Sequence, residues 1–189
     1  LLTGRIAIRC GISNHRGAVS HLRDQEVTIP ELLKTQGYTT GHFGKWHLGM
    51  LTPDYRGDKT VLMTPGMAGS DEWFASPSSV STYDPYMDPG AAGRAIGGAK
   101  ADPQPVDLRA GFIHNGQPLS EPIEGCAAKI VMDRAIPFIR NASEKGQPFL
   151  AVIWFNPPHS PVVGHPKYMD ELYSHLPDPQ QHYYSLATA

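Results

Sequence analysis

The chain has 189 residues, of which 40% are hydrophobic and 18% are charged, and its formal net charge is −2. This length and composition suit one globular domain, or most of one, and exclude a disordered polar chain. The small negative charge argues against a nucleic-acid binder, whose surface carries a surplus of basic residues. No apolar run approaches the ~20 residues that a membrane span needs, so no membrane span is expected, and no nucleic-acid partner is expected either.

The first residues are expected to finish a helix at Leu1–Gly4, and a loop is expected around residues 11–17. Because the chain starts without Met and inside an apparent motif, we interpret it as a fragment that lacks its N-terminus. Cys10 and Cys126 can pair or remain free, and two cysteines do not settle the redox compartment.

A helix is expected to begin at Thr28–Glu31, a Thr-Ile-Pro-Glu string. The threonine can cap the first turn, the proline is tolerated there, and the glutamate completes a capping box. Leu32 and Leu33 are expected to face the core. Gly37 is expected to end the helix in a left-handed conformation.

A short strand is expected at Tyr38–Phe43, followed by the loop Gly44–Gly49, whose glycines let the backbone approach a ligand closely. A helix followed by a strand is half of a βαβ unit, which predicts an α/β fold with a mixed or parallel sheet. Lys45 and His47 should emerge where open α/β sheets place their ligands. Their i, i+2 spacing predicts that both point to one side and Trp46 to the other, which suits an anion. The alternative is a turn with a packed Trp and solvated Lys and His.

An irregular, loop-rich insertion is expected at about residues 51–122, where Pro, Gly, Ser, Asp and Tyr dominate. Its cluster Ser81–Tyr86 can stack on a sugar ring or merely pack the loop. A hairpin that turns at Asn115–Gly116 is expected at Phe112–Leu119. Four aspartates whose spacing fits no compact calcium loop are interpreted as solvated turn residues, namely Asp71, Asp84, Asp88 and Asp102.

Two further elements are expected in the last third of the chain. A helix is predicted from about Glu124 to Asn141, with Pro137 kinking its last turn. The apolar run Phe149–Phe155 is typical of a central strand buried on both faces. It leads into Asn156–Pro161, so that polar residues again follow a strand.

Three of these segments resemble motifs of the type I sulfatases. Gly37–Gly49 resembles the second signature of that family, which ends in Gly-Lys-Trp-His-Leu-Gly, and Leu1–Arg5 resembles the tail of the first signature. Pro158–Pro161 matches the family's Pro-His-x-Pro loop, whereas Asp71–Phe74 is a weaker match. The resemblance implies an alkaline-phosphatase-like α/β fold, a mixed and largely parallel sheet flanked by helices. Residues 1–189 would then be part of the N-terminal catalytic domain.

The resemblance also implies an activity and three site residues. Type I sulfatases hydrolyse a sulfate ester with a formylglycine nucleophile, and they use a bound calcium ion (Ca2+). By position in the motifs, Lys45 would contact the sulfate and the formylglycine, and His47 would be a base for the elimination of sulfate. His159 would bind the substrate beside its bridging oxygen and be the acid for the leaving alcohol. For each of the three, the alternative is an ordinary solvated or packed loop residue.

The nucleophile and the calcium ligands implied by the family are expected outside this chain, before Leu1 and after Ala189. No metal ligand is therefore assigned, and residues 1–189 alone are expected to be inactive. Cys10 is not a candidate nucleophile, because Gly-Ile-Ser follows it rather than Pro-Ser-Arg. A small buried or paired cysteine is its expected role.

The expected partner is a small-molecule or glycan sulfate ester, and the aromatic residues of the insertion favour a sulfated carbohydrate. The family implies secretion or a periplasmic location, or a lysosomal one in a eukaryote. Two alternatives to a sulfatase remain open. One is a phosphonate or phosphodiester hydrolase of the same superfamily, and the other is a non-catalytic protein that binds sulfated glycans.

Overall fold

The fold is a mixed sheet with helices packed against it, in a computed structural model that describes residues 1–12, 21–51, 62–77, 79–85, 112–119, 123–160 and 162–189. Within these residues the sheet has five strands, in the order β4-β3-β2-β1-β5. They are β1 (Thr39–Lys45), β2 (Glu72–Ser76), β3 (Ile113–His114), β4 (Gln117–Pro118) and β5 (Phe149–Trp154). β1 is parallel to β2 and β5, whereas β3 is antiparallel to β2 and β4. The expected α/β class, with a mixed and largely parallel sheet, is confirmed.

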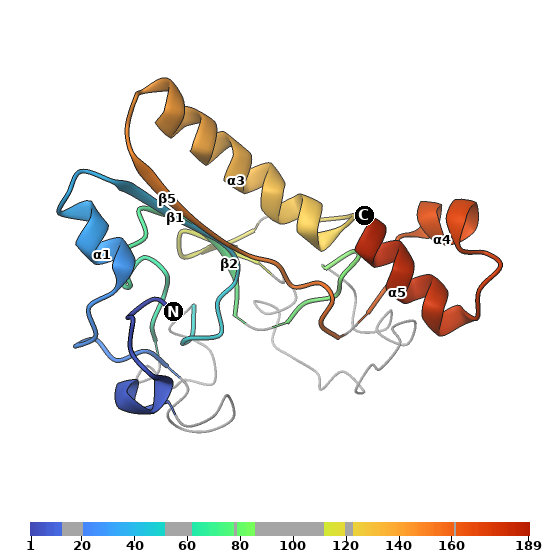
Figure 1. Ribbon diagram of the computed structural model, residues 1–189, viewed down its shortest axis with the longest axis horizontal. Helices are drawn as coiled ribbons and strands as arrows, with labels where there is room; N and C mark the ends of the chain where they lie inside the picture. The colour runs from blue at the N-terminus through green and yellow to red at the C-terminus, as the bar shows by residue number, and fades with distance from the viewer. Residues whose placement is uncertain (13–20, 52–61, 78, 86–111, 120–122, 161) are drawn as a thin grey trace.

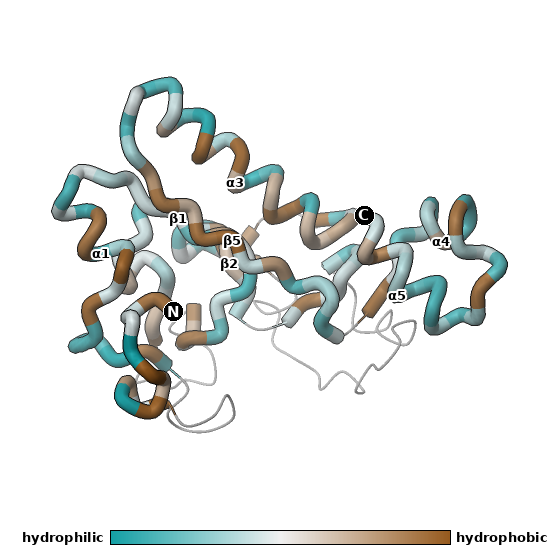
Figure 2. Tube along the Cα trace, in the orientation of Figure 1, coloured by the Kyte–Doolittle hydropathy of each residue, from teal (hydrophilic) through white to brown (hydrophobic). Residues whose placement is uncertain are grey.

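The longest described helix runs along the sheet, and two shorter ones form a pair at the other end of the molecule from α1 (Figure 1). The helical elements are the 3-10 helix η1 (Ala7–Cys10), α1 (Ile29–Lys34), α3 (Ala127–Glu144), α4 (Pro166–Leu172) and α5 (Asp178–Thr188). Hydrophobic and hydrophilic residues alternate along α3, as expected for a helix with one face on the sheet (Figure 2). None of the described helices is long and apolar enough to cross a membrane.

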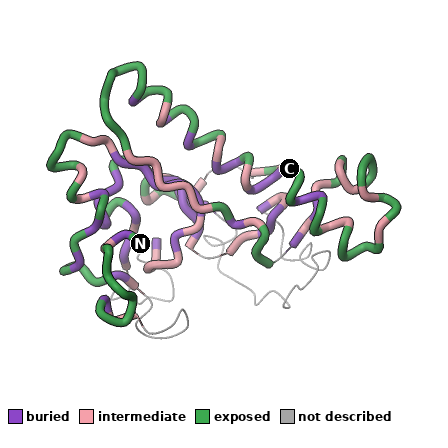
Figure 3. The backbone as a smooth tube through the Cα atoms, viewed as in Figure 1, coloured by how far each residue is buried: buried purple, intermediate pink, exposed green. Residues whose placement is uncertain are grey.

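Two hydrophobic clusters cover the two faces of the sheet, because successive strand residues point to opposite sides. Phe43 of β1 faces α3, where its ring centroid lies 5.4 Å from that of Phe138. His42, one residue earlier, faces the other cluster and contacts the rings of Trp46 and Trp154, at centroid distances of 5.0 and 5.1 Å. Buried residues accordingly follow the middle of the sheet (Figure 3).

The start and the end of α1 follow the sequence pattern. Glu31 N donates to Thr28 Oγ1 and Thr28 N donates to Glu31 Oε2, so the expected capping box is confirmed. Gly37 has a φ of 82°, which is the expected left-handed conformation after the helix. Leu32 was expected in the core but is 56% exposed. It lies two residues from the buried Pro30, and residues two apart on a helix do not share a face.

One expectation about the first residues is wrong. Leu1–Gly4 is a turn rather than the end of a helix, since Gly4 has a left-handed φ of 64° and its N–H donates to Leu1 O. The helix expected from about Glu124 to Asn141 is confirmed as α3, Ala127–Glu144. Both cysteines are free and buried, so Cys10 and Cys126 do not pair.

β5 was expected to be a central strand buried on both faces. Among the described residues it has one neighbour, β1, and lies at the edge of the sheet. Its residues Leu150–Trp154 are half-buried, and Phe149 is 36% exposed. An apolar run thus reports a hydrophobic environment, but it does not report how many strands lie beside it.

The stretch expected to be irregular contributes three strands to the sheet. β2 was not expected from the sequence, whereas the β3–β4 hairpin at Asn115–Gly116 is confirmed. Trp73 N of β2 donates to Asn115 Oδ1 at 2.7 Å, and Asn115 N donates to Trp73 O at 3.0 Å. These bonds fix the hairpin turn against β2.

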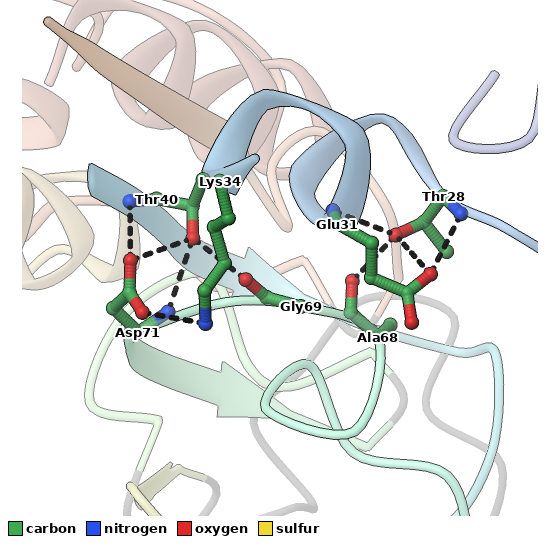
Figure 4. Close-up of polar contacts among 7 residues, drawn as sticks. All are labelled: Thr28, Glu31, Lys34, Thr40, Ala68, Gly69 and Asp71. Carbon is green, nitrogen blue, oxygen red and sulfur yellow. Dashed lines mark hydrogen bonds and ion pairs between the residues drawn. The ribbon is translucent and has the colours of Figure 1, made fainter. Parts of the chain in front are cut away.

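Asp71 was expected to be a solvated turn residue; it is exposed, and it also joins α1 to the amino ends of β1 and β2 (Figure 4). Its carboxylate lies 2.7 Å from Lys34 Nζ and accepts from Thr40 N at 2.9 Å. Burial alone would raise the pKa of Asp71, but the hydrogen bonds from Lys34 and Thr40 outweigh burial and lower it. Asp84 also has a structural partner, Gly125 N at 2.6 Å. Asp88 and Asp102 lie outside the described residues.

Candidate active site

The carboxyl ends of the three parallel strands β1, β2 and β5 lie side by side and form the carboxyl edge of the sheet. In the strand register Lys45, the last residue of β1, pairs with Ser76, the last residue of β2. Gly44 pairs with Trp154, the last residue of β5, so the residues after Trp154 leave the sheet beside Lys45. Open α/β sheets place ligands outside such an edge.

Lys45 lies at this edge with its ammonium group held in place. Nζ donates a hydrogen bond to Ser79 Oγ at 3.0 Å, and burial lowers the pKa of Lys45 below its ordinary value. The next residue, Trp46, is buried, and its Nε1 donates to Met63 O at 2.6 Å. A half-buried cation that has lost part of its hydration favours an anionic ligand.

Gly44 is required here by the packing of two strands rather than by a ligand. It has a φ of 109°, and a Cβ atom on it would lie 1.9 Å from Trp154 O of β5. From the sequence, the glycines of this loop were expected to let the backbone approach a ligand. For Gly44, the close approach is to the neighbouring strand.

His47 follows the strand in an unusual backbone conformation. Its φ is 52°, and its side chain is half-buried. Because β1 ends at Lys45, the alternation rule that predicted a common side for Lys45 and His47 does not extend to His47. Left-handed conformations are uncommon for residues other than glycine and are concentrated at functional sites.

Asn156 connects the segments that follow β2 and β5. Its Nδ2 donates to Ser76 Oγ at 3.3 Å, and Val80 N donates to its Oδ1 at 3.4 Å. Asn156 is 2% exposed and Ser76 is 0% exposed. Since Val80 is adjacent to Ser79, one network joins Lys45 to the residues after β5.

His159 lies in a turn that Asn156 begins. Its N–H donates to Asn156 O at 3.0 Å, and the imidazole is exposed. Nδ1 lies 2.7 Å from the carbonyl oxygen of Ser160. A carbonyl oxygen only accepts, so Nδ1 is the protonated nitrogen and Nε2 is left to exchange a proton with a ligand.

Lys45, His47 and His159 were expected in the site from the sequence, whereas Ser76, Ser79 and Asn156 were not. The structure connects Lys45 with the turn of His159 through the missed residues. The sequence position of these residues could have indicated a role in the site. Ser76 ends β2, Ser79 follows β2 and Asn156 follows β5, so all three lie at the carboxyl ends of parallel strands.

The segment after β2 also contains the aromatic cluster that was expected to contact a sugar or pack the loop. The ring of Tyr83 lies 5.1 Å from that of His165, edge to face, so Tyr83 does pack against a neighbouring segment. Burial, and secondarily Asp84, raises the pKa of Tyr83. Tyr86 lies outside the described residues.

The described residues do not provide a calcium site. No group of three or more His, Cys, Asp or Glu side chains among them is placed to hold a metal ion. Cys10 does not fit a nucleophile, since it is 2% exposed and its Sγ lies 3.5 Å from Thr3 Oγ1.

The family model described as Sulfatase matches residues 1–183. The chain belongs to the sulfatase family. It is 30% identical over 181 residues to the N-acetylgalactosamine-6-sulfatase of Canis lupus familiaris, a match that covers 86% of this chain and 30% of that protein. It is 30% identical over 173 residues to arylsulfatase G of the same species, covering 86% of this chain and 31% of that protein. The chain thus spans about 30% of the length of these relatives.

A solved structure supports the same fold for this sulfatase chain. It is the structure of Ps i-CgsB in complex with k-i-k-neocarrahexaose, with a TM-score of 0.72 and 22% identity. The match covers 98% of this chain and 39% of that chain. At this level of identity the likeness concerns the fold, which agrees with the mixed sheet described above.

Proposed function

We propose that the complete natural protein containing this chain hydrolyses sulfate esters, and that residues 1–189 form part of its N-terminal catalytic domain. The observation that carries the proposal is the half-buried ammonium group of Lys45 at the carboxyl edge of the parallel strands. A fixed cation there is suited to the negative charge of a sulfate group and to the charge that develops on its oxygens. Membership of the sulfatase family supports this reading of the site.

In this proposal three side chains have separate roles. Lys45 binds the sulfate group and stabilises its negative charge. His47 accepts a proton when sulfate is eliminated from the enzyme. His159 binds near the bridging oxygen, and its Nε2 donates a proton to the leaving alcohol, for which the bond from Nδ1 to Ser160 O already orients the ring.

The proposal includes two groups that the family implies. The family implies a formylglycine nucleophile and a calcium ion, which would supply the attacking oxygen and a positive charge for the sulfate group. The described residues fit neither group, so the three roles given above are those of side chains of this chain alone. Export to the periplasm or the outside of the cell, or to a lysosome in a eukaryote, belongs to the same family-based proposal.

We further propose that the substrate is a sulfated carbohydrate. Support comes from the name of one relative, N-acetylgalactosamine-6-sulfatase, and from the hexaose bound in the structural neighbour. The sequence also contains aromatic residues, Tyr83 and Tyr86, of the type that stacks on the apolar face of a sugar ring. A sulfated oligosaccharide therefore fits better than a small aryl or steroid sulfate.

The test is a comparison of hydrolysis rates of the complete natural protein on matched esters. A panel of sulfated oligosaccharides, aryl and steroid sulfates, and the corresponding phosphate and phosphonate esters should show the highest kcat/KM for a sulfated sugar. Faster hydrolysis of the phosphorus esters would instead assign a phosphohydrolase. Binding of sulfated glycans without turnover of any ester would assign a binding protein.

A further inference from the structure

We infer that Asn156 is a positioning residue of the candidate active site: its buried amide holds the loop of Ser79 and, through that loop, the ammonium group of Lys45. The inference rests on the proposed function, because Lys45 is assigned there to the sulfate group. Asn156 itself is 2% exposed, and its side chain is used in bonds to the protein, so it does not contact the substrate.

The side chain of Asn156 is bonded at both ends to segments far away in the sequence. Nδ2 donates to Ser76 Oγ, at the end of β2, and Oδ1 accepts from Val80 N, in the loop after β2. Buried polar groups are almost always hydrogen-bonded, and losing one partner leaves the other unsatisfied. Asn156 therefore fixes where the loop after β2 lies relative to the end of β5.

This loop in turn fixes Lys45. Ser79 precedes Val80 directly, and Ser79 Oγ accepts the hydrogen bond from Lys45 Nζ at 3.0 Å. If the bond to Val80 is lost, the hydroxyl that orients the ammonium group can move away. A misplacement of ~1 Å in a catalytic group can lower activity by ~100-fold.

An asparagine meets both requirements of the position. Its short amide offers one donor for Ser76 and one acceptor for Val80, whereas alanine offers neither. The bond from His159 N goes to the main-chain oxygen of Asn156 and not to its side chain. A substitution of the side chain therefore removes the link to Lys45 but retains the bond that forms the turn of His159.

The first test measures kcat/KM of the complete natural protein on its best sulfate ester. Asn156→Ala should lower kcat/KM by roughly 10- to 100-fold. Adding Asn156→Ala to Ser79→Ala should lower it by less than about 2-fold further, since both act through the same link. If the decreases in kcat/KM of the two single variants multiply fully in the double variant, the inference is wrong.

A matched control separates positioning from stability. Thr40 is also a buried polar residue, with 0% exposure, but it lies at the start of β1, at the opposite edge of the sheet. Thr40→Val should lower the melting temperature and leave kcat/KM within about 2-fold, because only local bonds are lost. If Asn156→Ala behaves in the same way as Thr40→Val, Asn156 is structural and the inference is wrong.

A second measurement does not depend on activity. Amide hydrogen exchange in Asn156→Ala should become faster at Val80 and stay unchanged at His159, because only the Val80 bond uses the side chain. If Asn156→Ala does not fold, Ser76→Ala removes one of the two bonds, and it should change exchange at Val80 in the same direction.

The two readouts distinguish the inference from the proposed function. Absence of turnover of every sulfate ester by the wild type refutes the proposed function, and faster exchange at Val80 still supports the link through Asn156. Unchanged exchange at Val80 overturns the inference, even in an active enzyme.

Discussion

Lys45 and Ser79 are joined by a hydrogen bond of 3.0 Å from Nζ to Oγ, although Lys45 ends β1 and Ser79 follows β2. Because of this bond, the position of the ammonium group at the end of β1 depends on the position of the loop after β2. Since burial also lowers the pKa of Lys45, the ammonium group is both fixed and partly desolvated. Such a cation suits the anion site that we propose at this edge of the sheet.

The Lys45→Ala variant should lose sulfate affinity and turnover together. Removal of one fixed charge from an anion pocket is expected to lower kcat/KM by ~100- to ~1,000-fold. The measurement is steady-state kinetics on a sulfate ester, together with calorimetric titration with sulfate. Lys129→Ala is the matched control, because Lys129 pairs with Asp133 on the exposed side of α3. Unchanged sulfate binding in Lys45→Ala would exclude Lys45 from the site.

His47→Ala should slow turnover without weakening sulfate binding to the same degree. A proton-transfer residue contributes typically ~100- to ~10,000-fold to the rate. The expected pattern is a fall in kcat with a smaller change in KM, measured over a range of pH. An unchanged kcat would show that the positive φ of His47 serves the fold of the loop and not the reaction.

His159→Gln should affect substrates according to their leaving group. If His159 donates a proton to the leaving alcohol, its loss should slow sugar sulfates by ~100-fold or more and slow 4-nitrophenyl sulfate much less, since nitrophenolate leaves without protonation. The ratio of the two kcat/KM values is the measurement. His175→Ala, a change at another exposed histidine, is the control. Equal losses on both substrates would contradict an acid role.

The stability of the protein should depend on the protonation of His42. Burial lowers the pKa of His42 from 6.5 to about 4, so below pH 6.5 the unfolded chain binds a proton that the folded chain resists. The contribution of His42 to the free energy of unfolding is constant above pH 6.5. It falls by about 3 kcal/mol in total as the pH drops to about 4. Chemical denaturation between pH 7 and pH 4 measures it.

A non-titrating ring at position 42 provides the matched comparison. His42→Phe retains the edge-on contacts with Trp46 and Trp154 but cannot bind a proton. Its free energy of unfolding should therefore fall less steeply with decreasing pH than that of the wild type. Identical slopes would show that other groups account for the acid sensitivity.

Two substitutions at the amino ends of β1 and β2 should differ in their cost (Figure 4). Lys34→Met breaks an ion pair whose side chains are 43% and 38% exposed, so a loss of ~0–1 kcal/mol is expected. Thr40→Val removes the buried bond from Oγ1 to Gly69 O and should cost ~1–3 kcal/mol. Denaturant unfolding of both variants gives the comparison. A larger loss for Lys34→Met would contradict the view that burial decides the cost.

Local features of the chain were readable from the sequence because they depend on neighbours along the chain. The capping box of Thr28 and Glu31, the left-handed Gly37 and the hairpin at Asn115–Gly116 are each set by a few consecutive residues. The same holds for the α/β class, which follows from the order of helix and strand. Within the candidate site, Lys45, His47 and His159 were selected from the sequence by their match to the sulfatase motifs.

Only the tertiary structure decided which distant segments meet. β2 was hidden in a stretch without periodicity, and β5, despite its apolar run, lies at the edge of the described sheet. The network of Ser76, Ser79 and Asn156 was not visible either, since its hydrogen bonds join residues that come together when three parallel strands align. Sequence patterns record the environment of each residue along its own element, whereas the register between strands determines which side chains share a site.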